Sequence, residues 1–200
     1  MILGYVIIDP DNGENMFENA LQNKCANYSN IYDLNCINPS YQFRKKQYNI
    51  SSTYEGFKIV SEKFKRFCEK EKYEGLEFVK LPKSDGFYWF KIHNIIEYDT
   101  DARKTQFINF NKECNGYEEI IGATPVCLKV KTVLNDSFYR TDICFGSFAD
   151  KSPLEIVGEM TMKKLRAAGF NDIFFEEILD EYEWQKKDED PNAIIIEQPV

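Results

Sequence analysis

The alternation of apolar and polar residues along the chain predicts several β-strands. An apolar run at residues 2–8 ends at the turn residues "DPDNG", and residues 86–99 form a long aromatic and β-branched run. That second run is typical of one or two strands near the centre of a sheet. Residues 41–50 also alternate, which predicts a strand with Tyr41 and Phe43 facing inward.

Weaker patterns complete the predicted secondary structure. Residues 124–134 alternate and are followed, after the turn "NDS", by the apolar run at residues 138–148. Two such runs joined by a short turn predict an antiparallel hairpin. Residues 102–110 add a further strand, and residues 14–25 are interpreted as a short helix with its apolar residues on one side.

A longer pattern occurs twice, and the two copies align without a gap. The stretch "KIVSEKFKRFCEKEKYEGLEFVKL" at residues 58–81 aligns with "EIVGEMTMKKLRAAGFNDIFFEEI" at residues 155–178, 97 residues further along. Each copy has the pattern of a short apolar strand, a helix of about three turns, a break and a second strand. We therefore expect an internal strand–helix–strand repeat, whether it arose by duplication or from common patterning.

The sequence marks the two helix starts differently. Ser61 is a suitable N-cap for the first helix, and Gly75 is its expected left-handed end. In the second copy two starts compete, because "SPLE" is a capping box that would begin a helix at Ser152. The alignment instead makes Ile156 part of a strand and Gly158 the N-cap. We favour the alignment because it keeps the two units equally long.

These patterns predict an α+β protein with a mainly antiparallel or mixed sheet and two helices in the repeat. We expect an N-terminal strand-rich segment, residues 1–56, that packs on a main α+β domain at residues 57–185, followed by a C-terminal tail at residues 186–200. The 200 residues include 16 Phe and 12 Tyr, which is typical of a folded chain rather than a disordered one.

The ends of the chain and its cysteines bear on its location. The opening "MILGYVIIDP" has no basic segment, and its apolar run is too short for a signal peptide or a membrane-spanning helix, which needs about 20 apolar residues. The six cysteines occur singly, without a C-x-x-C pair, and His93 is the single histidine. We therefore expect a cytoplasmic protein with reduced, buried thiols and without a metal or other cofactor.

Charge is concentrated near the C-terminus. Residues 176–190 contain eight carboxylates and two lysines, which accounts for six of the eight formal negative charges. Such a segment repels nucleic acid and attracts a basic protein. A solvated acidic surface without a partner is the alternative. The candidate partner-binding residues are Glu176, Glu177, Asp180, Glu181, Tyr182, Glu183 and Trp184.

The repeat also carries a family resemblance. The motifs "VSEKF" and "GLEF", the run into "NIIEYD", and the second copy "IVGE" with "AGFNDIFFEEI" resemble a family of bacterial immunity proteins of polymorphic toxin systems, formerly catalogued as a domain of unknown function. The resemblance covers about residues 57–178. It departs from the family pattern at Gly158, where a Ser is usual, and at Asn171 and Asp172. It implies a small cytoplasmic protein that binds and blocks a cognate toxin without turnover.

An enzyme is the rival interpretation. A hydrolase or transferase would be built around His93 with Asp99 or Asp101, and the spacing of the two aspartates is similar to that of carboxylates that hold a divalent ion. The sequence lacks the phosphate-binding loop, nucleophile-elbow, zinc-protease and dinucleotide motifs. We therefore predict a protein without catalytic residues that binds a basic protein partner, and neither nucleic acid nor membrane.

Overall fold

The computed structural model describes residues 1–17 and 24–180, which form an α+β fold, as predicted. Its helices are η1 (Ala26–Tyr28), α1 (Ile31–Leu34), α2 (Glu62–Glu71), α3 (Thr100–Arg103) and α4 (Glu159–Ala167). Its strands are β1 (Ile2–Ile8), β2 (Ile50–Ser52), β3 (Lys58–Ser61), β4 (Leu76–Lys80), β5 (Phe87–Ile92), β6 (Ile95–Ile96), β7 (Gln106–Asn111), β8 (Gly116–Ile121), β9 (Phe138–Ser147), β10 (Ser152–Val157) and β11 (Phe174–Leu179).

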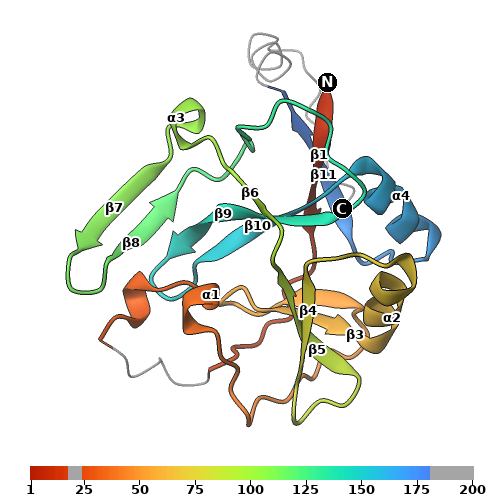
Figure 1. Ribbon diagram of the computed structural model, residues 1–200. Helices are drawn as coiled ribbons and strands as arrows, with labels where there is room; N and C mark the ends of the chain where they lie inside the picture. Colours follow the sequence, from red (N-terminus) through yellow and green to blue (C-terminus); the bar gives the residue numbers. More distant parts are fainter. Residues whose placement is uncertain (18–23, 181–200) are drawn as a thin grey trace, which may run out of the picture.

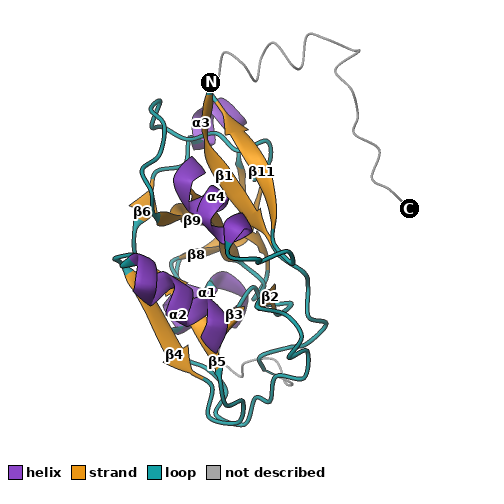
Figure 2. Cartoon of the chain, turned by 90° about the vertical axis from the view of Figure 1, so that its right-hand side faces the viewer, coloured by secondary structure: helices purple, strands orange, loops and turns teal. Residues whose placement is uncertain are grey.

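The strands form two sheets that lie one above the other in Figure 1. The upper sheet has the order β11–β1–β10–β9–β8–β7, and the lower sheet has the order β2–β3–β5–β4. All neighbours in these two orders pair antiparallel, while β6 pairs with β9 in parallel. Helices α2 and α4 lie on the same side of the molecule, with α4 above α2 (Figures 1 and 2).

The predicted repeat is present as two similar units, β3–α2–β4 and β10–α4–β11. In each unit the two strands run parallel to each other and are separated by one antiparallel strand, β5 in the first unit and β1 in the second. Helix α2 begins at Glu62 and α4 at Glu159, which are aligned positions in the sequence. The strand–helix–strand order is therefore confirmed in both copies.

The helix starts follow the alignment rather than the capping box. Residues 152–157 are strand β10, so a helix start at Ser152 is excluded, and Gly158 is the N-cap of α4. In the first unit, the Ser61 hydroxyl accepts a hydrogen bond from the backbone N–H of Phe64, as an N-cap should. The predicted end at Gly75 is wrong, because α2 ends at Glu71 and Lys72 takes the left-handed conformation.

The core between the two units is aromatic. Phe64 of α2 is fully buried, and its ring centroid lies 5.4 Å from that of Phe90, 6.0 Å from Phe138 and 5.4 Å from Phe170. The residues around this cluster come from both helices and both sheets: Ile50, Val60, Cys68, Ile92, Val157, Met162 and Leu165. One shared hydrophobic core therefore holds the two units together.

A buried ionic cluster also joins the two sheets. The ammonium of Lys58 on β3 pairs with Asp9, which follows β1, and lies 3.3 Å from a carboxylate oxygen of Glu155 on β10. Lys58 and Glu155 are equivalent positions of the two repeat units. Burial raises the pKa of Glu155 to about 7, and the positive charge of Lys58 offsets only part of that effect. Burial acts to lower the pKa of Lys58, but Asp9 and Glu155 outweigh it and raise that pKa.

Two predicted strands are absent. Residues 124–134 form an extended segment rather than a hairpin strand, held to residues 97–99 by hydrogen bonds from Asp99 N–H to the Cys127 carbonyl and from Lys129 N–H to the Glu97 carbonyl. Its alternation arises because Val126, Leu128 and Val130 pack on the upper sheet. Residues 41–49 are likewise irregular, although Tyr41 and Phe43 are buried as expected.

Other predictions fare differently. Residues 86–99 contain β5 and β6, and residues 102–110 contain most of β7, as predicted. The short helix predicted at residues 14–25 falls partly on residues 18–23, which lie outside the described residues, and residues 14–17 are not helical.

The expectation of reduced cysteines is wrong at one pair. Cys25 and Cys114 form a disulfide that joins the segment before η1 to the turn between β7 and β8. The two positions are 89 residues apart, so their spacing gave no signal of pairing. Cys68 and Cys144 are buried thiols, as expected, whereas Cys36 is exposed. Burial raises the pKa of Cys144 to about 12. Disulfides are typical of oxidising compartments, so this pair does not support the expected reducing environment.

Candidate functional site

Strand β11 lies at one edge of the upper sheet, beside β1 (Figure 2). It pairs with β1 in an unbroken antiparallel register from Gly4 opposite Ile178 to Ile8 opposite Phe174. Among the described strands β1 is its sole neighbour. Because half of the N–H and C=O groups of a strand point to each side, the outer edge of β11 presents backbone donors and acceptors that β1 does not use.

The exposed side chains of this edge are acidic and aromatic. Glu176 and Glu177 are exposed on opposite faces of the strand, and Phe174 keeps 68 % of its surface in contact with solvent. Phe175 instead packs on the core, where the guanidinium of Arg166 lies 5.5 Å from its ring centroid. Within residues 1–17 and 24–180, neither Glu176 nor Glu177 forms an ion pair.

The remaining predicted partner-binding residues follow the strand. The carboxylate of Asp180 pairs with the N-terminal ammonium of Met1 at 3.2 Å, so it also fixes the start of β1. Glu181, Tyr182, Glu183 and Trp184 lie outside the described residues. The structure thus brings Glu176 and Glu177 onto one edge strand and adds Phe174, which the charge pattern did not single out.

The equivalent edge of the lower sheet has a different charge pattern. Strand β4 carries Glu77, whose carboxylate lies 3.1 Å from the Lys91 ammonium and 2.9 Å from His93 Nε2. Partial burial acts to raise the pKa of Glu77, but the hydrogen bonds from Lys91 and His93 outweigh it and lower that pKa. The acidic group on β4 is therefore neutralised by its own sheet, unlike those on β11.

The residues of the rival enzyme interpretation have separate partners. His93 is half exposed and contacts Glu77. Asp99 is the N-cap of α3, where its side chain accepts from the backbone N–H of Ala102, and Asp101 lies in the first turn of that helix. Among the described hydrogen bonds and ion pairs, none joins His93 to either aspartate.

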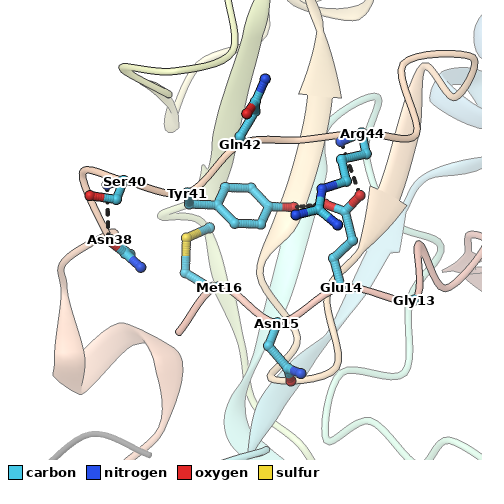
Figure 3. A pocket seen from close by; sticks show the side chains of 9 residues that line it. All are labelled: Gly13, Glu14, Asn15, Met16, Asn38, Ser40, Tyr41, Gln42 and Arg44. Atoms are coloured by element: carbon cyan, nitrogen blue, oxygen red, sulfur yellow. Dashed lines mark hydrogen bonds between the residues drawn. The ribbon is translucent and has the colours of Figure 1, made fainter. Parts of the chain in front are cut away.

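A cavity lies elsewhere, where residues 13–16 meet residues 38–44 (Figure 3). It has a volume of about 430 Å³ and a mostly polar lining. The Tyr41 hydroxyl donates to Glu14 at 2.7 Å, and the backbone N–H of Arg44 donates to the same carboxylate at 2.9 Å. Burial, together with the Glu14 carboxylate, raises the pKa of Tyr41, so this hydroxyl is unsuited as a nucleophile. The hydrogen bonds of Glu14 to Tyr41 and Arg44 instead hold residues 13–16 against residues 38–44.

No group of three or more His, Cys, Asp or Glu side chains within the described residues is placed to hold a metal ion. No helix in that part of the chain is both long and apolar enough to cross a membrane.

Comparisons with protein-family models, with curated proteins and with solved structures found no match to this chain.

Proposed function

We propose that this protein is a non-catalytic binding protein of the immunity type, which neutralises a basic toxin by stoichiometric occlusion. The observation that supports the proposal most directly is the acidic edge strand β11, where Glu176 and Glu177 are exposed without an ion pair in the described residues. An unpaired acidic surface attracts a basic partner and discourages an anionic one such as nucleic acid. The family resemblance of residues 57–178 points to the same class.

Charge and apolar contact have different roles in this proposal. Complementary charge raises the association rate and selects the partner, whereas affinity comes from a few buried aromatic or apolar contacts. Phe174 is the exposed aromatic side chain beside the two glutamates. Asp180, Glu181, Tyr182, Glu183 and Trp184 extend the proposed surface along the sequence.

The proposal is tested by recovering the partner and changing the edge. The tagged protein is purified from its native source, and a bound polypeptide is identified by mass spectrometry and then titrated by calorimetry. We expect a basic protein that binds one-to-one. We also expect the double variant Glu176→Lys/Glu177→Lys to bind at least about tenfold more weakly at low salt, because two attractive contacts become repulsive.

A matched control separates this surface from overall charge. Glu69 and Glu74 lie on the first repeat unit and are exposed, so Glu69→Lys/Glu74→Lys makes the same change in net charge away from β11. The control is expected to bind normally. Equal affinity of both double variants, with both correctly folded by circular dichroism, would refute the role of β11.

A cytoplasmic location belongs to the same proposal. The disulfide Cys25–Cys114 makes it testable, because cytoplasmic thiols are kept reduced. Cells are lysed in an alkylating reagent and the protein is analysed by mass spectrometry. Alkylation at both cysteines would agree with the cytoplasm, and protection of both would assign the protein to an oxidising compartment.

A further inference from the structure

We infer that the partner binds by adding a β-strand to β11, and that its strand carries two adjacent basic residues. The inference rests on the proposed function, since it says how the basic partner is held. Within the described residues, the outer edge of β11 has no partner strand, and it offers an extended segment a ready ladder of hydrogen bonds.

The other sheet edges are poorer templates. At the far end of the same sheet, β7 contains Asn109 with a φ of 54°, a left-handed conformation that interrupts the regular ladder in mid-strand. In the lower sheet, β2 has three residues, and the acidic group of β4 already pairs with the Lys91 ammonium and contacts His93. Strand β11, by contrast, has six residues and five consecutive pairs with β1.

The side chains of β11 define what an added strand must carry. Successive side chains of a strand point to opposite faces, and those of directly opposed residues lie side by side. Glu176 and Glu177 are consecutive, so an added strand needs basic residues at two consecutive positions to neutralise both faces. Phe174 lies two positions before Glu176, on the same face, and is matched by an apolar or aromatic residue two positions beyond the basic pair.

The resulting motif depends on strand direction. In an antiparallel addition the partner has the order basic, basic, any residue, apolar, and in a parallel addition the order is reversed. Alternating basic residues, which place both charges on one face, would leave either Glu176 or Glu177 without a partner. The motif therefore requires a particular order of residues, and not only a certain number of positive charges.

Two synthetic hexapeptides serve as probes for the full-length protein. They are acetylated and amidated Thr-Lys-Lys-Val-Phe-Thr and its reverse, Thr-Phe-Val-Lys-Lys-Thr. A scrambled peptide, Lys-Thr-Lys-Val-Thr-Phe, has the same composition but places both lysines on one face of a strand. Titration followed by fluorescence or NMR is expected to show one of the two directional probes binding at least about tenfold more tightly than the scrambled one.

Backbone methylation separates strand addition from attraction between charges. In an added strand, alternate N–H groups of the peptide point to β11 and the others point to solvent. Two N-methylated forms of the tighter probe, each modified at one alternate set of residues, carry identical charge. We expect one set to weaken binding about tenfold or more and the other to change it little. Hydrogen exchange of β11 amides is expected to slow when the probe binds.

The possible failures are distinguishable. Equal binding of both N-methylated forms would overturn strand addition, and so would equal binding of directional and scrambled peptides. In either case, if the intact partner protein no longer bound the Glu176→Lys/Glu177→Lys variant, the proposed function, occlusion of a basic partner, would still stand. A partner that binds this double variant normally would overturn both proposals.

Discussion

The two repeat units have the same arrangement of strands and helix but differ in their core residues and in the charge of their edge strands. Units β3–α2–β4 and β10–α4–β11 both place a helix between parallel strands that flank a central antiparallel strand, and both end in a strand at a sheet edge. The first unit supplies Phe64 to the shared core, where the second has Thr161 at the aligned position. At the edge of the second unit, Glu176 and Glu177 form no ion pair with any described residue, whereas Glu77 at the edge of the first unit pairs with Lys91. The first unit thus supplies the central ring of the core, and the second carries the edge that we propose for partner binding.

The largest expected effect concerns the unequal core contributions. Phe64→Ala removes a fully buried ring that contacts three other rings, and it is expected to lower the free energy of unfolding by about 3–5 kcal/mol. Thr161→Ala at the aligned position loses the hydrogen bond to Asp136, 2.8 Å long, and is expected to cost about 1 kcal/mol. Urea denaturation measures both. Similar losses in the two variants would show that the two aligned positions contribute equally to stability.

The next effect concerns the two N-caps. Gly158 approaches the loop before β9 so closely that a Cβ at this position would collide with the carbonyl oxygen of Asn135. Gly158→Ser, which copies the cap of the first unit, is therefore expected to destabilise the protein by about 3 kcal/mol despite the favourable hydroxyl. The reciprocal change Ser61→Gly is expected to cost only a few tenths of a kcal/mol, about what a Ser-to-Gly cap exchange costs. A stable Gly158→Ser variant would show that the loop can move away.

A smaller, pH-dependent effect comes from the pair Lys58 and Glu155, where the two units meet. The pKa of Glu155 is raised to about 7 from an ordinary value of 4.5, so the native state retains a proton that the unfolded chain releases between these values. The stability that this proton contributes is fully present below pH 4.5 and is lost as the pH rises to 7, by about 1–3 kcal/mol. Relative to the parent, Glu155→Gln should therefore gain stability across that window.

The measurement compares urea denaturation of the parent and Glu155→Gln from pH 4.5 to 8. Taking the difference between the two proteins cancels titrations elsewhere, and Asp9 remains as a partner of Lys58 in both. A difference that stays constant over this range would mean that Glu155 is ionised throughout.

Local patterns predicted the units themselves, but not how they assemble. The aligned residues and Ser61 were enough to place both helix starts, because caps and periodicity are set by neighbours in sequence. The exposure of Phe174 could not be predicted, because it depends on the edge position of β11. That position arises because β1, from the other end of the chain, lies between β11 and β10. The disulfide Cys25–Cys114 and the packing of residues 124–134 were missed for the same reason, since both depend on contacts between distant segments.

The smallest expected effect tests the two edges directly. Glu77→Gln deprives Lys91, 6 % exposed, of a charged partner, although Asn35 still accepts a hydrogen bond from its ammonium at 2.8 Å. We expect a loss of about 0.5–1 kcal/mol in the free energy of unfolding. Glu176→Gln/Glu177→Gln removes no ion pair of the described residues and is expected to change stability by less than about 0.5 kcal/mol. Denaturation at low salt measures both. A larger loss of stability in the β11 variant than in Glu77→Gln would mean that Glu176 and Glu177 stabilise the fold. The proposed binding edge would then not differ from the edge of the lower sheet.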